Sequence, residues 1–178
     1  MAYKVAGAAS AEGGSLDEVA RAVEHLNVNM ASMGVGLSPT ILPAAGEPTF
    51  TLDDGEMEIG IGIHGERGVR RGRIDTADSI ADELFSTTAA DLGVKSGDSI
   101  AVVINGMGAT PLEELYLLFR RISQHCRDTG IIIERTYVGE YATSLEMAGA
   151  SLTLVRLDDP LRRLLLAPAS SPFIGARL

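Results

Sequence analysis

The feature of the sequence that most constrains its fold is a nearly continuous apolar run over residues 99–105. Because the run does not alternate between apolar and polar residues, it predicts a central strand that neighbouring layers cover on its faces. A turn with Gly106 and Gly108 follows, and Thr110, Pro111 and Glu113 then match a capping box at the start of a helix. A strand, a glycine turn and a capped helix in this order indicate an α/β fold.

The glycine turn is also a candidate binding site. Backbone amides at the start of a helix can hold an anion, so Gly106, Gly108 and Thr110 form a candidate site for a phosphate group or a nucleotide. A tight connection from strand to helix that binds nothing explains the same pattern. Both interpretations stay open at this point.

Two further helices are marked by their caps. Ser15 and Glu18 form a capping box, and the apolar spacing after them predicts a helix that stops at Gly34. Asp75 or Thr76 caps another helix, which we expect to extend to position 92.

Strands are predicted over residues 131–138 and 152–157, and Pro160 opens a short terminal helix. Since helices do not separate every pair of strands, the sheet should be mixed. We therefore expect one α/β domain over residues 1–178, with a mixed β-sheet of about five to six strands packed with about four helices. The tail, residues 167–178, is expected to fray.

Within residues 56–65, large apolar residues alternate strictly, up to His64, with residues that are polar or glycine. As a strand, this segment would turn four apolar side chains toward the core: Met57, Ile59, Ile61 and Ile63. The opposite face would carry Gly60 and Gly62 as a floor without side chains, with His64 at its end. Glycine inside a strand marks a place where another group approaches the backbone closely, so His64 is a candidate to contact a small ligand. The alternative is that His64 only ends a half-exposed strand.

The same segment matches G-x-G-x-x-G from Gly60 to Gly65, the fingerprint of dinucleotide-binding folds. That motif works as a turn between a strand and a helix, whereas here no helix start follows. Instead, four arginines lie within residues 67–73, among them Arg67 and Arg70. These arginines can meet a phosphate or an acidic partner, although a solvated loop explains them as well.

Composition argues against several function classes. The net charge of −9 argues against nucleic acid and against anionic membranes as partners. Cys126 is the single cysteine, which excludes an internal disulfide and a thiolate metal cluster. The three histidines lack the spacing of metal ligands, so no metal site is expected. No apolar run is long enough to span a membrane and the N-terminus lacks a secretory signal, so we expect a cytoplasmic protein.

Several segments together resemble the substrate-binding subunit of the dihydroxyacetone kinases, in particular its second half. They are residues 43–50, 56–66, 105–116 and 141–149. Their order and spacing agree along nearly the whole chain, which is far more specific than any single motif.

The resemblance implies that His64 corresponds to the histidine whose ring nitrogen adds to the substrate ketone and forms a covalent hemiaminal. Gly60, Gly62 and Gly65 are then expected to lie on the substrate side. An imidazole can attack a carbonyl carbon, whereas a polyol offers no such atom, so covalent capture would select short ketoses. The implied activity is that of a subunit of a glycerone (dihydroxyacetone) kinase, which transfers a phosphoryl group to an alcohol.

The resemblance also implies partners. Nothing in the chain resembles the first half of the family's subunit or the separate nucleotide-binding subunit. We therefore expect a chain that binds no cofactor, is inactive alone and works with an N-terminal-half chain. The phosphoryl donor, ATP-Mg or a phosphocarrier, is expected on another partner subunit. An isolated half-subunit would expose the surface that normally meets the missing half, so we expect the chain to associate into a homo-oligomer.

Some residues depart from the family's pattern. Arg67 stands where the pattern has proline and Glu47 where it has lysine. Glu140 and Ala142 stand where it has asparagine and methionine. These positions surround the expected site, and they leave the substrate open between dihydroxyacetone, a C4 ketose such as erythrulose and a sugar-acid derivative. The alternative function is a non-catalytic ketose-sensing or regulatory coactivator module, and a third is a phosphate-binding or nucleotide-binding domain built on residues 106–110.

Overall fold

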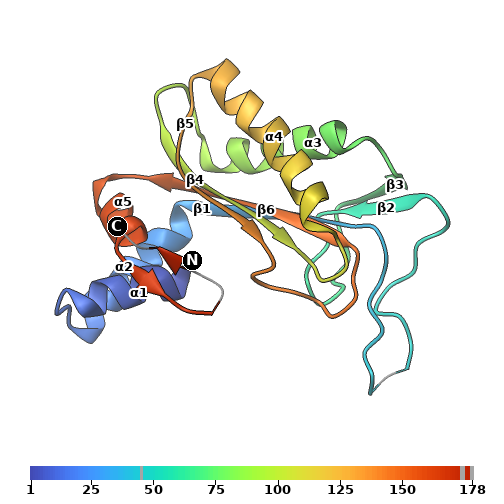
Figure 1. The fold of residues 1–178 in the computed structure, drawn as a ribbon, viewed down its shortest axis with the longest axis horizontal. Helices are drawn as coiled ribbons and strands as arrows, with labels where there is room; N and C mark the ends of the chain where they lie inside the picture. The colour runs from blue at the N-terminus through green and yellow to red at the C-terminus, as the bar shows by residue number, and fades with distance from the viewer. Residues whose placement is uncertain (45, 173–174, 177–178) are drawn as a thin grey trace.

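A six-stranded sheet with the order β3-β2-β1-β6-β4-β5 forms the frame of the computed structural model, which describes residues 1–44, 46–172 and 175–176 (Figure 1). Its strands are β1 (Met30–Gly36), β2 (Glu56–Ile59), β3 (Arg70–Arg73), β4 (Ser99–Gly106), β5 (Ile132–Gly139) and β6 (Gly149–Leu157). The helices in the described residues are α1 (Ala2–Ala11), α2 (Leu16–Val28), α3 (Ala77–Leu92), α4 (Leu112–Thr129) and α5 (Asp159–Leu166). A small second sheet pairs β7 (Ala169–Ser170) with β8 (Gly175–Ala176).

The large sheet is mixed, as predicted. β4 and β5 run parallel, and α4 makes the crossover between them. The other neighbouring strands of this sheet are antiparallel. The expected fold class, a single α/β domain, is confirmed.

Two apolar layers explain why the run over residues 99–105 does not alternate. Ile100, Val102 and Ile104 pack into the cluster that also contains side chains of α3 and α4. Ala101 and Val103 pack into a second cluster, with side chains of α1, α2 and α5. Figure 1 shows α3 and α4 on one side of the sheet, and α1, α2 and α5 gathered at one end on the other. β4 is therefore buried from both faces, as its sequence predicts.

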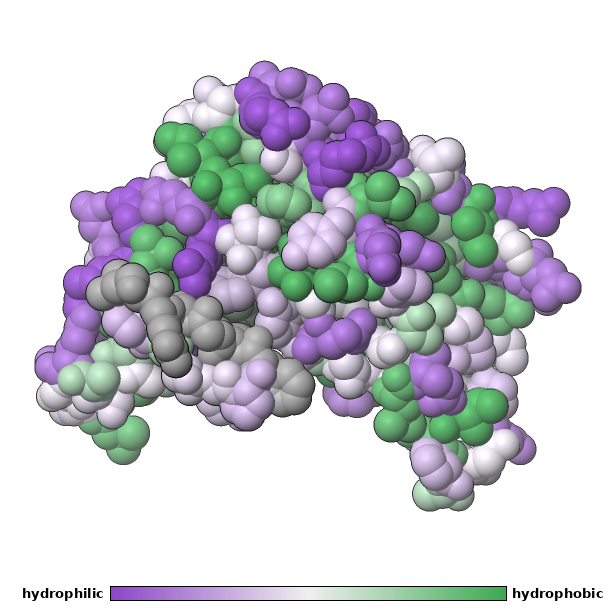
Figure 2. Space-filling view, in the orientation of Figure 1, coloured by the Kyte–Doolittle hydropathy of each residue, from purple (hydrophilic) through white to green (hydrophobic). Residues whose placement is uncertain are grey.

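The second layer leaves part of its sheet face uncovered. A hollow of about 1000 Å³ extends over this face, and its wall includes polar residues of three adjacent strands: Ser32, Ser151, Thr153 and Asn105. The hollow also reaches α3 on the other side of the sheet, where Thr87, Thr88 and Asp91 line it. The connection from β1 to β2 projects away from the sheet (Figure 1) and carries hydrophobic residues on its surface (Figure 2), where Ile41 and Leu42 are about half exposed.

The helix predicted to stop at Gly34 is shorter than expected. The capping box of Ser15 and Glu18 is confirmed, but α2 ends at Val28 and residues 30–36 form β1. The methionines after position 28 fit helical spacing, yet β1 pairs with β6 along its whole length, and these long-range hydrogen bonds outweigh the local pattern. Helix α1 was not predicted. The helix expected from Thr76 to position 92 is confirmed as α3.

The strand predicted over residues 56–65 is confirmed only over β2. At Gly60 the backbone turns to φ +81, and the chain leaves the sheet. Met57 and Ile59 lie in the apolar core as predicted. The opposite face is not open as expected, since Glu58 is only 3% exposed. Part of the arginine segment is a strand rather than a loop, because β3 pairs with β2 from Arg70 onward, whereas Arg67 stays in the loop before it.

The capping box predicted at Thr110 is also wrong. Pro111 takes the capping position of α4, and no side chain bonds there. The tail predicted to fray, residues 167–178, lies partly outside the described residues, and within them β7 pairs with β8. None of the helices in the described ranges is long and apolar enough to cross a membrane.

Candidate functional site

The residues singled out around His64 lie in the connection between β2 and β3, residues 60–69, which we call the His64 loop. β2 and β3 are antiparallel with Ile59 opposite Arg70, so the loop closes a hairpin. The Gly60 N–H donates to the Gly34 carbonyl at 2.6 Å, and the Val69 N–H donates to the Ile59 carbonyl at 2.8 Å. A Cβ at Gly60 would lie 2.9 Å from Val69, so this tight, left-handed turn needs glycine.

Glu58 holds the base of the loop from below. Its carboxylate accepts the Gly68 N–H at 2.6 Å and the Arg71 Nη2 at 2.5 Å. Burial alone would raise the pKa of Glu58, but the hydrogen bonds from Arg71 and Gly68 outweigh it and lower the pKa below its ordinary value. A buried, ionised carboxylate thus joins strands β2 and β3 to the end of the loop. The sequence pattern had placed Glu58 on the open face and missed this role.

His64 lies on the exposed turn of the loop. Its side chain is 78% exposed. The ring Nδ1 lies 2.8 Å from Glu66 Oε1, and the His64 N–H donates to Glu66 Oε2 at 3.0 Å. The backbone N–H of Glu66 itself, followed by the His64 ring, lowers the pKa of the Glu66 carboxyl. The imidazole is therefore accessible to a ligand and held by one carboxylate.

The glycine floor predicted beside His64 is not formed as expected, because the strand that would carry it ends at Ile59. A Cβ at Gly62 would overlap the Glu66 carboxylate, which occupies the space above this glycine. Gly65 adopts φ +80 and lies so close to Thr49 that an added Cβ would be 2.7 Å from the threonine Cβ. Whether Gly60, Gly62 and Gly65 contact substrate stays a prediction.

The loop borders the hollow on the uncovered sheet face. Gly60, Gly62 and Ile63 line this hollow from one side, and Tyr141 and Ala142 line it from the other. His64 follows Ile63 directly in the sequence but does not itself line the hollow. Two segments far apart in the sequence thus enclose one open space.

Asn105 positions the second of these segments, and sequence reasoning did not single it out. Its Oδ1 accepts the N–H groups of Tyr141 and Ala142, each at 2.8 Å, and its Nδ2 donates to the Ala142 carbonyl at 2.8 Å. The side chain is buried at the end of β4. A polar residue that ends a long apolar strand was the signal that could have found it.

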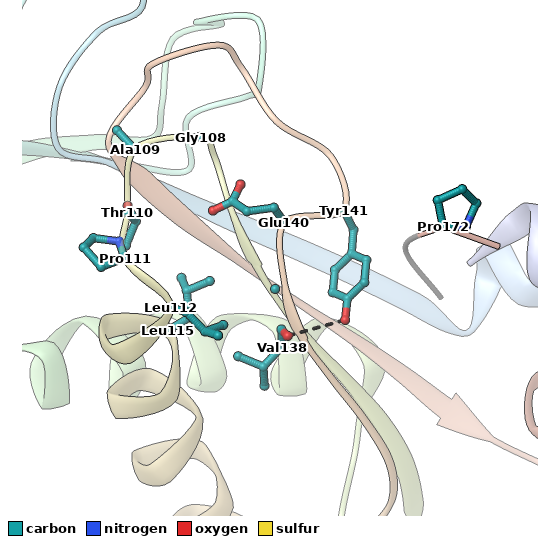
Figure 3. Close-up of a pocket in the computed structure, with 11 residues that line it drawn as sticks. Gly108, Ala109, Thr110, Pro111, Leu112, Leu115, Val138, Glu140, Tyr141 and Pro172 are labelled. Carbon is teal, nitrogen blue, oxygen red and sulfur yellow. Dashed lines mark hydrogen bonds between the residues drawn. The ribbon is translucent and has the colours of Figure 1, made fainter. Parts of the chain in front are cut away.

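The second predicted site, at Gly106, Gly108 and Thr110, lies beside a separate pocket of about 600 Å³ (Figure 3). Figure 3 shows the Glu140 side chain pointing toward the turn. Its carboxylate fills the space where a Gly106 Cβ would be, and it accepts a hydrogen bond from the Gly108 backbone. Burial raises the pKa of Glu140, and the Gly108 bond only partly offsets this. An anion at this turn would have to displace a carboxylate of the chain itself.

Thr110 and Arg70 have structural partners. The Thr110 hydroxyl donates to the Gly149 carbonyl at 2.7 Å and accepts the Gly149 N–H at 2.8 Å, which ties the turn to β6. Arg70 forms a two-pronged ion pair with Glu83 of α3. Arg67 is exposed on the His64 loop. Within the described ranges, no three His, Cys, Asp or Glu side chains group as metal ligands would.

Comparison with known proteins identifies relatives along the whole chain. The model of the Dak1 domain matches residues 1–173. A dihydroxyacetone-binding subunit DhaK of a PTS-dependent dihydroxyacetone kinase from Listeria innocua is 41% identical over 173 residues, which are 97% of this chain and 52% of that protein. An L-erythrulose 1-kinase from Mycolicibacterium smegmatis is 42% identical over 174 residues, which are 96% of this chain and 30% of that protein.

A solved structure is also similar. The dihydroxyacetone kinase operon co-activator Dha-DhaQ superposes with a TM-score of 0.86 at 32% identity, over 94% of this chain and 52% of that one. The chain therefore spans about half the length of the DhaK subunit and of the co-activator that it matches, and a smaller share of the erythrulose kinase.

Proposed function

Since the chain belongs to the Dak1 domain family, we propose that it is the carbonyl-binding part of a kinase for short-chain ketoses. The observation that carries this proposal is His64, an exposed imidazole that a carboxylate holds through Nδ1, on a loop whose residues 60–63 line an open hollow. The relatives named for binding dihydroxyacetone and for phosphorylating erythrulose support the same substrate class.

The geometry suits covalent capture of a ketone. A carboxylate on Nδ1 leaves Nε2 as the nitrogen that can attack a carbonyl carbon. The adduct fixes the ketose in one orientation, and phosphoryl transfer to its terminal hydroxyl then depends mainly on positioning and on charge stabilisation. Dihydroxyacetone and a C4 ketose such as erythrulose are the substrates that we propose.

Partner chains complete the proposed enzyme. The chain spans about half of its DhaK relative, and a hollow of about 1000 Å³ lies open beside residues 60–63 of the His64 loop. We assign the rest of the site to an N-terminal-half partner, and ATP-Mg or a phosphocarrier to a nucleotide-binding or donor subunit. Self-association of this chain belongs to the same proposal.

Native mass spectrometry tests the capture step. The chain is incubated with dihydroxyacetone or erythrulose, alone and with a first-half partner chain. We expect an adduct with the mass of one ketose that is lost in His64→Ala. His25→Ala is the matched control, because His25 is also partly exposed and paired with a carboxylate, that of Asp158, but lies on α2. An adduct that persists in His64→Ala, or that forms under neither condition, would overturn the proposal.

A second candidate function is a regulatory module that binds a ketose without turnover. The observation that favours it is the close structural likeness to an operon co-activator. Reconstitution with the first-half chain, the donor subunit and its phosphoryl donor separates the two functions. Phosphorylated ketose that disappears in His64→Ala supports the kinase, whereas an adduct without any turnover supports the regulatory module.

A further inference from the structure

Glu66 binds His64 with both of its carboxylate oxygens. Oε1 lies 2.8 Å from the ring Nδ1, and Oε2 accepts the backbone N–H of the same residue at 3.0 Å. The Glu66 carbonyl also accepts the Gly62 N–H at 3.2 Å, which closes the turn under the imidazole. Attraction between two exposed charges contributes little, so this set of hydrogen bonds is what fixes the carboxylate against the ring.

From this geometry we infer that Glu66 is a positioning residue that holds His64 in the tautomer with the proton on Nδ1, and that Gly62 is glycine in order to make room for the Glu66 carboxylate. The inference rests on the proposed function of His64 and deepens it. It differs from the expectation that Gly62 leaves space for the substrate.

The tautomer follows from the chemistry of the partner. An ionised carboxylate can only accept hydrogen bonds, so Nδ1 must donate its proton to Glu66. In the neutral ring the lone pair then lies on Nε2, the nitrogen that does not face Glu66. The lowered pKa of Glu66 is consistent with a carboxylate that is ionised at neutral pH.

The same contact supports the covalent step. Nε2 donates its electron pair to the carbonyl carbon of the ketose, an N–C bond forms, and the π pair of the C=O bond moves onto oxygen. That oxygen takes a proton from water. The ring becomes positively charged as the bond forms, and its Nδ1 proton passes to Glu66 and on to solvent, which leaves a neutral hemiaminal with the mass of protein plus ketose.

Gly62 must be glycine for a different reason than Gly60 and Gly65. Gly60 and Gly65 have φ of +81 and +80, a conformation that side chains rarely adopt, whereas Gly62 does not have a positive φ of this kind. An alanine backbone fits at position 62, but its Cβ would overlap Glu66 Oε2 and lie 2.8 Å from Glu66 Cδ. The end of a flexible side chain can move away, so Gly62→Ala should displace the carboxylate without breaking the fold.

Nitrogen-15 NMR of the histidine rings tests the tautomer directly. In the wild-type chain at neutral pH we expect the neutral form of His64 to show a protonated Nδ1 and an unprotonated Nε2, with its signals identified by their loss in His64→Ala. In Glu66→Ala and in Gly62→Ala the proton should shift toward Nε2. The signals of His25, which pairs through its Nε2, should not change. An Nδ1 signal of His64 that is the same in wild type and in Glu66→Ala would overturn the inference.

Adduct formation provides the second readout. In metal sites, removing a partner that orients a histidine ligand commonly lowers metal affinity or activity by about 10- to 100-fold. We expect a loss of the same order in the rate of adduct formation for Glu66→Gln and for Gly62→Ala. Glu24→Gln, the same charge change on the exposed surface of α2, should form the adduct at the wild-type rate.

A double-mutant cycle separates the two explanations for Gly62. If Gly62 makes room for Glu66, then Gly62→Ala should have no further effect in the Glu66→Ala background. An equal loss in both backgrounds would show that Gly62 serves the substrate and would overturn this part of the inference. If the wild-type chain forms no adduct at all, the proposed function fails, while the tautomer measurement still decides the role of Glu66.

Discussion

Glu58→Gln tests how the His64 loop is held in place. The Glu58 side chain is 4% exposed and accepts hydrogen bonds from the Gly68 N–H and the Arg71 guanidinium. Glutamine has the same shape, but its NH₂ group would face a donor, so one of these bonds must be lost. A hydrogen bond to a charged group contributes about 1.5–3 kcal/mol, and breaking a fully buried ion pair costs about 3–5 kcal/mol. Because Arg71 is 44% exposed and water can solvate it, we expect the smaller loss, about 2 kcal/mol.

The loss is measured as the free energy of unfolding in urea. In a thermal melt, about 2 kcal/mol corresponds to a shift of roughly 4–8 °C for a chain of this size. Hydrogen exchange at the Gly68 amide should also accelerate, since this amide loses its acceptor. Glu56→Gln is the matched control, because Glu56 lies on the same strand but bonds only the nearby Asp53 N–H at a partly exposed position. A loss no larger than that of the control would refute the view that Glu58 clamps the loop.

Two further predictions concern other parts of the fold. Gly108→Ala should lower the free energy of unfolding by at least about 2 kcal/mol, because Gly108 has φ +132° and an added Cβ would overlap the Leu145 carbonyl. Gly97→Ala is the control: Gly97 has φ +88° but open space around it, so the substitution should cost only about 1 kcal/mol. Equal losses of the two variants in urea unfolding would contradict this account. Arg121, with a smaller contribution from His125, lowers the pKa of Asp82 from 3.8 to about 2. Since the pKa of Asp82 is lower in the folded state, its contribution to stability is complete above pH 3.8 and is lost as the pH falls toward about 2. Asp82→Asn should therefore flatten the pH dependence of the urea midpoint between these two values. An unchanged slope would contradict this prediction.

Local patterns predicted the parts of the fold that local interactions determine. The apolar run of β4 and the Thr76 cap of α3 can be recognised from neighbouring residues alone, and both were predicted correctly. β1 was missed because its methionines fit a helix equally well, and only pairing with the distant β6 decides between the two. Thr110 was misassigned for a related reason, since its hydroxyl bonds Gly149 rather than the helix that it precedes.

The site followed the same division. His64 became the leading candidate through resemblance over long stretches of sequence, and its role in binding a substrate stays a prediction. Glu58 could not be recognised from alternation, because its partner Gly68 lies beyond a loop that the pattern treated as a continuing strand. The crowding of Gly62 by Glu66 is likewise a property of the folded turn, which composition and spacing do not contain.

The His64 loop is joined to the sheet near its two ends, by hydrogen bonds to the Gly34 and Ile59 carbonyls and the Glu58 carboxylate, and by Ile61, which is 3% exposed and lies against Gly36 of β1. Neither of the two apolar clusters found in the described residues contains a member of residues 60–69. Residues 62–67 thus lie outside the apolar core, whereas Ile61 before them is buried. A graft or a random library confined to residues 62–67, which leaves the buried Ile61 in place and keeps Gly65, should change which small molecule is captured while the scaffold assembles as before.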